Sequence, residues 1–362
     1  MSIADGLTGS VAGARFRLVC DDDELREYAR VHLMRCLEGT TAVDVEVVLR
    51  WHDGAPPARP ERMLAAMRRV DRDLYLGDTS IRWYRVDDLR DLWLAFEWDG
   101  RQLRVEGDFH FRVANSERSD RLRRWLVPRQ TTAQRRRRYT TLLYYLVYYP
   151  CWWWLEHTGR MHPIHAAGVA SASGVTLLAG GSGIGKSTLA VALAAQPGAQ
   201  LLADSFVLHH QRQVRPVREP LLIDDQSRKW LGDACARLEP IAWSYLLNRG
   251  GYHMAAGQLG GGGVASRLLF PRRAPQAYVR PLDQRRAAAL LSAGDMVIND
   301  LRRYWAFAAV LEYLAGDGLM MQREQNIRGL TAAVPSYEIG LTLSHSRLET
   351  VAAIEGLATA AA

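Results

Sequence analysis

The residues whose types and spacing best match a known chemistry lie between positions 174 and 190, in the stretch GVTLLAGGSGIGKSTLA. Residues 175–178 have the length and composition of a buried strand, and residues 188–195 have the pattern of a helix. The pattern G-x-x-x-x-G-K-S between them predicts a phosphate-binding loop. This loop consists of Gly180, Gly181, Ser182, Gly183, Ile184, Gly185, Lys186, Ser187 and Thr188.

The predicted loop has the groups needed to bind a nucleoside triphosphate together with a magnesium ion. Its four glycines permit positive φ angles and let backbone N–H groups come close to phosphate oxygens. The N-terminus of the following helix adds its positive end to the same anion. Lys186 can reach the β- and γ-phosphates, and the Ser187 hydroxyl can ligate Mg2+.

Two further polar residues are candidates for the same site. Residues 199–204 form a second short apolar run that ends at Asp204, followed by Ser205. Ligands of α/β sheets bind at the carboxyl ends of strands, so Asp204 is expected to hold metal-bound water or accept a proton. His165 precedes the loop, and its alternative role is that of a core or capping histidine.

Length and composition indicate a soluble globular protein with more than one domain. The chain has 362 residues, of which 48% are hydrophobic and 23% are charged. Its cysteines are far apart and match neither a zinc site nor a disulfide framework. The first five residues lack the basic and apolar regions of a signal peptide, and we expect a cytoplasmic protein. The cysteines are Cys20, Cys36, Cys151 and Cys235.

The net charge of +7 has a local origin. Nine of the 46 basic residues are arginines between 118 and 138, where Asp120 is the only acid, and the remainder of the chain is near neutral. A basic nucleic-acid-binding body is therefore not expected. Three interpretations of the arginine run stay open: a solvated linker, a docking site for an acidic partner, and a contact with anionic membrane.

The apolar stretch 142–155, LLYYLVYYPCWWWL, follows the arginines at 135–138. It is too short to span a bilayer and contains Pro150. One interpretation is a buried helix that packs two domains together. The other is an interfacial anchor, so that membrane association is considered only through residues 135–155.

Three regions are expected along the chain. Residues 1–115 form an α+β domain, with strands at 14–20 and 43–49, a helix at 24–37, and an antiparallel meander at 81–86, 92–98 and 102–106 with a hairpin turn at Asp99-Gly100. Residues 116–160 form an Arg-rich connector and an aromatic helix. Residues 161–362 form the phosphate-loop domain, with strands at 221–225, 266–271 and 337–341 and helices at 285–291, 300–314 and 347–357.

With His165, the loop and Asp204 considered together, residues 160–357 resemble the HPr kinase/phosphorylase family, most closely the HPr-kinase-related proteins of which some modify peptides in biosynthetic clusters. The resemblance covers a little over half the chain. The similar segments are IHAAGV at 164–169, AGGSGIGKSTLA at 179–190, LLAD at 201–204, SRLLFP at 266–271, PLDQRRA at 281–287 and YEIGL at 337–341.

This resemblance implies an α/β fold with a C-terminal P-loop kinase domain, a nucleotide site like that of phosphoenolpyruvate carboxykinase, and ATP and Mg2+ as cofactors. The implied function is transfer of the γ-phosphoryl group of ATP to a hydroxyl, with serine as the expected acceptor, on a peptide, a protein or a small molecule. Asp204 would be the general base, His165 would help to position Asp204 or the γ-phosphate, and Lys186 would hold the transferred phosphate. Ser187 and Asp204 would be the metal ligands.

The second acid of the family is replaced here by Ser205, so the alternative function is a nucleotide-binding switch or an ATPase without kinase activity. A P-loop ATPase of another type would use the acids at 224 and 225, which follow an apolar run. Arg267, Arg272 and Arg273 are candidates to contact the transferred phosphoryl group. The resemblance also allows a homo-oligomer, because members of the family often assemble, whereas HPr itself is not the expected substrate.

Overall fold

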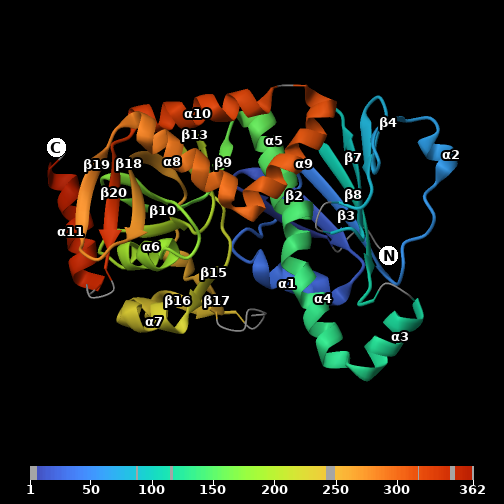
Figure 1. Cartoon of the computed structure of the whole chain (residues 1–362), viewed down its shortest axis with the longest axis horizontal. Coiled ribbons are helices and arrows are strands. Elements are labelled where there is room, and N and C mark those ends of the chain that lie inside the picture. Colours follow the sequence, from blue (N-terminus) through green and yellow to red (C-terminus); the bar gives the residue numbers. More distant parts are fainter. Residues whose placement is uncertain are drawn as a thin grey trace. The chain divides into compact units, whose positions relative to one another are not determined.

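The computed structural model describes residues 6–86, 89–114, 117–241, 249–316, 318–342 and 347–360. The chain forms two compact units with mixed α/β structure (Figure 1). The first unit contains Met1–Gly159 and Arg303–Gly318, and the second contains Arg160–Arg302 and Leu319–Ala362. The units are therefore discontinuous in sequence, and each is described by itself.

The first unit is built on an eight-stranded sheet in the order β1-β2-β3-β8-β7-β6-β5-β4. Strand β3 is parallel to both β2 and β8, and the remaining neighbours are antiparallel. The strands are β1 (Leu7–Val11), β2 (Ala14–Cys20), β3 (Val45–Asp53), β4 (Arg68–Asp71), β5 (Leu74–Leu76), β6 (Ser80–Trp83), β7 (Leu92–Trp98) and β8 (Leu103–Phe111).

The predicted strands and the hairpin turn of this unit are present. Residues of β2 alternate between buried and half-buried positions, as expected for a strand with one covered face. The antiparallel meander β6-β7-β8 forms as predicted. At its turn the Asp99 carboxylate accepts hydrogen bonds from the N–H groups of Arg101 and Gln102, and Gly100 has φ 89°.

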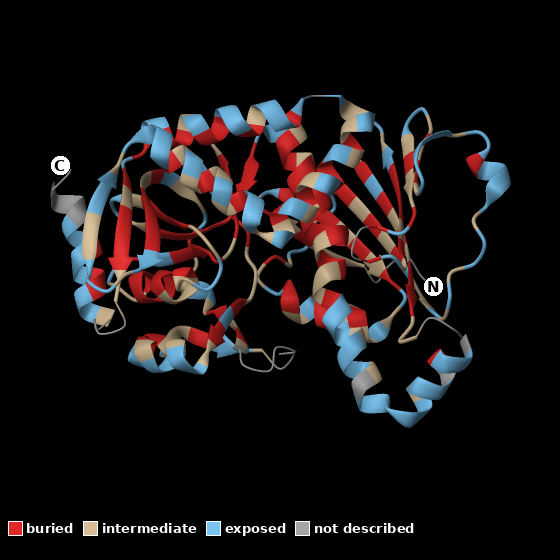
Figure 2. Cartoon of the chain, viewed as in Figure 1, coloured by how far each residue is buried: buried red, intermediate tan, exposed pale blue. Residues whose placement is uncertain are grey.

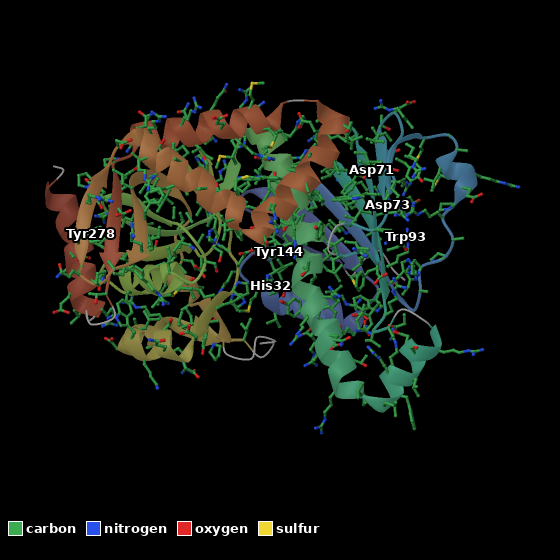
Figure 3. The ribbon with its side chains drawn as sticks, viewed as in Figure 1. His32, Asp71, Asp73, Trp93, Tyr144 and Tyr278 are labelled. Carbon is green, nitrogen blue, oxygen red and sulfur yellow. The ribbon has the colours of Figure 1, made fainter. Side chains whose placement is uncertain are left out.

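The helices of the first unit are α1 (Asp23–His32), α2 (Glu61–Leu64), α3 (Glu117–Leu126), α4 (Pro128–Leu143), the π-helical segment η2 (Tyr144–Tyr148) and α5 (Tyr149–Gly159). Asp22 caps α1 by accepting from the N–H of Leu25. The predicted helix 24–37 is too long, because α1 ends at His32 (Figure 3). The chain then turns so that the Cys36 carbonyl accepts from the N–H of Ser10 in β1, and this contact replaces another helical turn.

The aromatic stretch 142–155 is buried within the first unit. Trp152, Trp153 and Tyr148 have no exposed surface, and the Trp154 indole N–H donates to the Arg101 carbonyl. Of the two interpretations of this stretch, the structure therefore shows a buried helix and not an exposed anchor. Among the helices of the described residues, none has both the length and the apolar composition needed to cross a membrane.

Helix α9 (Asn299–Ala315) belongs to the first unit from Arg303 onward, although the chain before and after it lies in the second unit. The Tyr304 hydroxyl donates to the buried carboxylate of Glu156. The Phe307 ring packs edge-on against Phe96, with centroids 5.3 Å apart. A helix at 300–314 is predicted correctly, but its place in the first unit depends on these tertiary contacts.

The second unit contains a nine-stranded mixed sheet with the main order β12-β10-β11-β18-β14-β13-β9, to which β20 adds beside β18 and β19 beside β20. A separate three-stranded sheet has the order β15-β17-β16. The strands are β9 (His162–Ile164), β10 (Ala166–Ser171), β11 (Gly174–Ala179), β12 (Gln200–Ala203), β13 (Val207–His210), β14 (Gln213–Pro216), β15 (Leu221–Asp224), β16 (Leu238–Pro240), β17 (Arg249–Met254), β18 (Gly263–Arg273), β19 (Tyr278–Leu282) and β20 (Ser336–Leu341).

Helices cover both faces of the nine-stranded sheet. The helices that lie wholly in the second unit are α6 (Lys186–Ala194), α7 (Asp225–Leu231), η3 (Gly232–Arg237), η4 (Ala256–Gln258), α8 (Gln284–Val297), α10 (Leu319–Ala333) and α11 (Arg347–Ala360). Strand β11 alternates between the two resulting cores: Leu178 packs with residues of α6 and α11, and Leu177 packs with residues of α8 and α10. Figure 2 shows this central sheet buried between its helices.

Candidate functional site

The predicted strand, loop and helix are found in the second unit as β11, residues 180–185 and α6. Three of the four loop glycines have positive φ: 134° at Gly180, 77° at Gly183 and 95° at Gly185. A Cβ atom at Gly180 would lie 2.9 Å from the end of the Ile184 side chain, which can move aside, so it is the positive φ that favours glycine at this position. The chain therefore turns directly from the end of a buried strand into the N-terminus of a helix.

Lys186 is buried within this loop. Its Nζ atom donates to the carbonyl oxygens of Gly180 and Gly181, each at 2.9 Å, and only 7% of the residue is exposed. Burial lowers the pKa of Lys186 to about 8, and attraction to Asp204 offsets part of this shift. The loop thus holds a cation against its own backbone.

The strand register places His165 and Asp204 at the same edge of the sheet as the loop. Ala166 of β10 pairs with Ala179 of β11, so His165 lies opposite the first loop glycine. Gly168 of β10 pairs with Ala203 of β12, which brings Asp204 to this edge. Since β10 runs antiparallel to both neighbours, its amino end meets their carboxyl ends. His165, Lys186 and Asp204 are therefore brought together, as the sequence predicts.

Asp204 and Ser187 offer oxygen ligands of the kind that Mg2+ prefers. The Ser187 side chain hydrogen bonds to the Asp204 carboxylate, and Asp204 Oδ1 is buried without a hydrogen-bond partner among the described residues. No group of three His, Cys, Asp or Glu side chains suited to a metal occurs in the described parts of the chain. Mg2+ at nucleotide sites commonly takes one or two protein ligands and completes its shell with phosphates and water, so the pair fits this ion.

Burial raises the pKa of Asp204, against opposing effects of the Ser187 hydrogen bond, the Lys186 charge and the Ser205 N–H. Ser205 itself has φ 72°, a left-handed conformation uncommon for serine. The backbone turns there, so that Phe206 N–H donates to the Asp204 carbonyl and β13 begins at Val207. Asp204 is thus held at the tip of a strand in surroundings that favour proton uptake.

His165 is a neutral, buried histidine. Burial, followed by repulsion from Lys186, lowers its pKa to about 3, against a smaller effect of its hydrogen bond with the Gly180 backbone. Its ring packs on Phe206 with centroids 5.5 Å apart, and its Nδ1 atom is buried with no hydrogen-bond partner in the described structure. His165 can therefore support the loop beside Lys186 without adding a second positive charge.

The three candidate arginines have different surroundings. The Arg267 guanidinium donates to Thr176 and to the Ile354 carbonyl, and Arg272 pairs with Glu338 at 3.5 Å. Glu338 also accepts from the hydroxyl of Tyr278. Tyr278, labelled in Figure 3, lies on β19. Arg273, by contrast, is exposed and donates to the Gly183 carbonyl at 3.4 Å. Only Arg273, of these three, contacts the loop.

The acids considered for a different type of P-loop ATPase lie elsewhere. Asp224 ends β15, which belongs to the three-stranded sheet and not to the sheet of β11. Its carboxylate accepts from the Ser227 N–H and caps α7, while the Asp225 side chain is 91% exposed. Neither acid is arranged like Asp204 beside the loop lysine.

Asp295 is a buried acid that the sequence analysis missed. Its Oδ1 accepts from the His165 backbone N–H at 2.8 Å, whereas Oδ2 has no hydrogen-bond partner within the described residues. Burial raises its pKa to about 7, although the His165 N–H opposes the shift. The sequence does contain a signal that Asp295 is buried. It follows the buried residues Ala287 and Leu291 of α8 at intervals of one helical turn, on the same face of the helix.

No family model and no curated protein matches this sequence. A comparison with solved structures finds a similarity to the HPr(Ser) kinase/phosphatase from Coxiella burnetii, with 13% sequence identity and a TM-score of 0.26, over 54% of this chain and 97% of that chain. A TM-score this low does not establish a shared fold. Membership of that family therefore stays a prediction from the sequence.

The environment of Asp295 predicts a specific pH dependence of stability. Its pKa rises from 3.8 to about 7 on folding, so between these values the unfolded carboxylate is ionised while the folded one stays protonated, and stability falls as the pH rises. In Asp295→Asn the amide oxygen can still accept from His165 but cannot ionise. The melting temperature of this variant minus that of the wild type should therefore increase across this pH interval.

Thermal unfolding followed by circular dichroism at a series of pH values measures this difference. His165 and Asp204 titrate in both proteins, so their effects cancel. Asp225→Asn, at an exposed acid, is the control and should give a flat difference. A flat difference for Asp295→Asn as well would contradict the assignment.

Proposed function

We propose that the second unit binds ATP with Mg2+ at the loop 180–188 and transfers the γ-phosphoryl group to a hydroxyl, with serine on a peptide or protein as the expected acceptor. The observation that carries this proposal is the buried arrangement of Lys186 beside Asp204, a carboxylate that interacts with the Ser187 side chain and whose Oδ1 has no hydrogen-bond partner among the described residues. A phosphate-binding lysine, a metal-binding hydroxyl and a basic carboxylate are the groups that phosphoryl transfer requires.

Each residue of the proposed site has a role that follows from its position. The loop N–H groups and Lys186 bind the β- and γ-phosphates, and Ser187 and Asp204 hold the metal, which neutralises phosphate charge when bound. Asp204 accepts the proton of the attacking hydroxyl, a role suited to a carboxylate whose pKa is raised by burial. His165 stays neutral and supports Gly180 and Asp204. Most of the rate then comes from positioning and charge neutralisation.

Arg273 is the arginine that we assign to the transferred phosphoryl group. It lies at the carboxyl end of β18, which is parallel to β11, so both strands end at the same edge of the sheet. Its guanidinium is exposed and already reaches the loop at Gly183. Arg267 and Arg272 have partners that keep them in structural contacts.

A nucleotide-binding switch without transfer activity is the second candidate. It is favoured by Ser205, which stands where the resembling family has its second acid and which adopts a left-handed conformation. A switch would bind ATP and change conformation or partner affinity, and would leave hydroxyl substrates unmodified. Binding and transfer must therefore be measured separately.

Lys186→Ala should abolish measurable ATP binding, because it removes the cation that faces the phosphates. Isothermal titration with ATP and Mg2+ measures the affinity. The control is Lys229→Ala, at the only other lysine of the sequence, which is exposed on α7. If Lys186→Ala binds ATP with wild-type affinity, the proposed phosphate site is wrong.

Asp204→Asn should retain ATP binding but lose phosphoryl transfer by about a hundredfold, since the amide cannot accept the proton. The assay incubates the protein with ATP, Mg2+ and a library of serine-containing peptides and detects phosphorylated products by mass spectrometry. Asp225→Asn is the exposed control. A wild type that binds ATP and phosphorylates none of the peptides, while exchanging nucleotide, would favour the switch.

Arg273→Gln should reduce transfer by at least about tenfold and leave ATP affinity nearly unchanged, because its contact is with charge that develops during transfer. Arg280→Gln is the matched control, since Arg280 is exposed and pairs with Glu338 away from the loop. The assignment fails if Arg273→Gln weakens ATP binding and leaves transfer at saturating ATP unaffected.

A further inference from the structure

Helix α3 of the first unit has two different faces. The inner face is held to the end of β8: the Asp120 carboxylate accepts from the N–H groups of Val113 and Ala114. Arg124 donates to Asp120 at 2.6 Å and to the Phe111 carbonyl at 2.6 Å, and it also pairs with Asp53 at 2.9 Å. These contacts fix which side of α3 points away from the unit.

The outer face is apolar and exposed. Leu122, Trp125 and Leu126 recur at helical spacing on the side opposite the anchored residues, and they are 55%, 77% and 58% exposed. Arg118 begins the same stripe and is also exposed. Large apolar side chains gathered on one helix face usually have a partner surface, whereas scattered ones need no explanation. In Figure 2 α3 and the first turns of α4 are almost wholly exposed.

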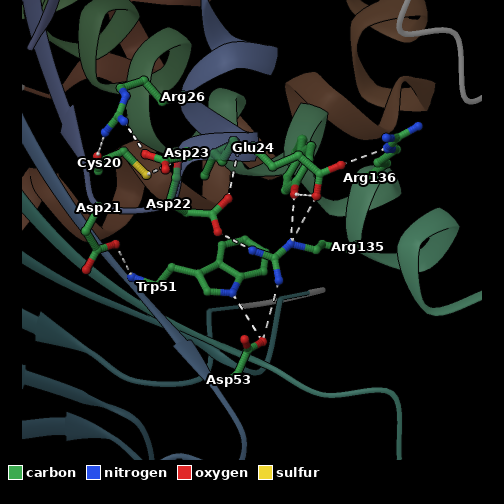
Figure 4. Close-up of polar contacts among 12 residues, drawn as sticks. Cys20, Asp21, Asp22, Asp23, Glu24, Arg26, Trp51, Asp53, Arg135 and Arg136 are labelled. Atoms are coloured by element: carbon green, nitrogen blue, oxygen red, sulfur yellow. Dashed lines mark hydrogen bonds and ion pairs between the residues drawn. The ribbon is translucent and has the colours of Figure 1, made fainter. Parts of the chain in front are cut away.

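The arginines of the run 118–138 whose side chains the structure describes fall into two groups. In the first group, Arg124, Arg135 and Arg136 pair with acids of the same unit. Arg135 also stacks over the Trp51 ring at 4.4 Å (Figure 4). These side chains are structural, and their charges are compensated inside the unit.

The second group is exposed and uncompensated. Arg118, Arg129, Arg137 and Arg138 form no ion pair with any side chain that the structure describes, and Arg123 contacts only the Val113 carbonyl. Asp120, the only acid between 118 and 138, points inward to the β8 end. Among the described side chains, the outer surface of α3 and of the start of α4 therefore presents positive charge and no acid around an apolar stripe.

We propose that this surface, formed by Arg118, Leu122, Arg123, Trp125, Leu126 and Arg129, docks on an anionic lipid bilayer. A helix with an apolar stripe containing Trp and Leu and flanked by arginines lies in the headgroup region, where the stripe is buried and the guanidinium groups meet lipid phosphates. Positive charge around the stripe suits an anionic bilayer, whose headgroups supply a net negative charge. The contact is peripheral, because the apolar stripe covers one helix face only.

This surface replaces the one suggested by the sequence. Residues 139–155 cannot make the contact, because Tyr139 and the tryptophans at 152 and 153 are buried in the unit. Of the arginines at 135–138, the first two are paired with acids. The inference is independent of the proposed kinase activity, since every residue in it belongs to the first unit.

The test is co-sedimentation of the full chain with phosphatidylcholine vesicles that contain or lack phosphatidylserine. The wild type should pellet with the anionic vesicles only, and binding should weaken as salt is raised. Trp125→Ala and the double variant Arg118→Gln/Arg129→Gln should each reduce the binding constant by about tenfold or more. The exposed side chains make these variants compatible with folding, which circular dichroism verifies.

Matched controls use exposed residues outside this surface. Leu348→Ala, 65% exposed on α11, and Arg285→Gln/Arg328→Gln should bind vesicles like the wild type. Subtracting the fluorescence emission spectrum of Trp125→Phe from that of the wild type isolates the emission of Trp125. This emission should shift to shorter wavelength on contact with anionic vesicles. Absence of vesicle binding, equal binding to neutral vesicles, or binding unaffected by the α3 variants would overturn the proposal. Capture by polyglutamate or single-stranded RNA through Trp125, without vesicle binding, would assign the surface to a macromolecular partner instead.

Discussion

The antiparallel pairing of β10 with β11 is the constraint on which the candidate site depends. Its register sets Ala166 against Ala179, so the chain entering β10 and the chain leaving β11 meet at one edge. His165 therefore lies against Gly180, and pairing of β10 with β12 delivers Asp204 to the same place. A shift of one residue in this register would turn the side chains to opposite faces of the sheet and separate the loop from its acid and its histidine.

Burial of charge is the second feature of this site. Lys186, Asp204 and Asp295 are each more than nine-tenths buried, and burial moves the pKa of each toward its neutral form. Buried ionisable groups with free lone pairs cost stability, and proteins keep such groups where binding or chemistry uses them. His165 avoids a further cost by remaining neutral beside the lysine. Asp204 Oδ1, Asp295 Oδ2 and His165 Nδ1 are buried without a hydrogen-bond partner among the described residues.

The first unit shows how one residue type serves two purposes. Arg135 is enclosed by the acids at the start of α1 and by the Trp51 ring, and so holds α4 to the sheet. Arg118 and Arg129, in the same run, are left exposed around Trp125. The distinction follows from which side of each helix meets the body of the unit. Composition alone counts nine equivalent arginines and cannot separate those that hold the fold from those that face outward.

The sequence by itself determined the local elements: the strand, glycine loop and helix around Lys186, the β6-β7-β8 meander with its Asp99-Gly100 turn, and the strand that ends at Asp204. These depend on φ preferences, on the alternation of apolar and polar residues and on hydrogen bonds within a few residues, which a sequence pattern contains.

Only the tertiary structure decided that Asp295 meets His165, 130 positions away, that α9 packs in the first unit, and that Trp152 is buried while Trp125 is exposed. It also decided that Arg273, rather than Arg267 or Arg272, contacts the loop. Such outcomes depend on which distant surfaces exclude water from one another, and no local pattern specifies that choice.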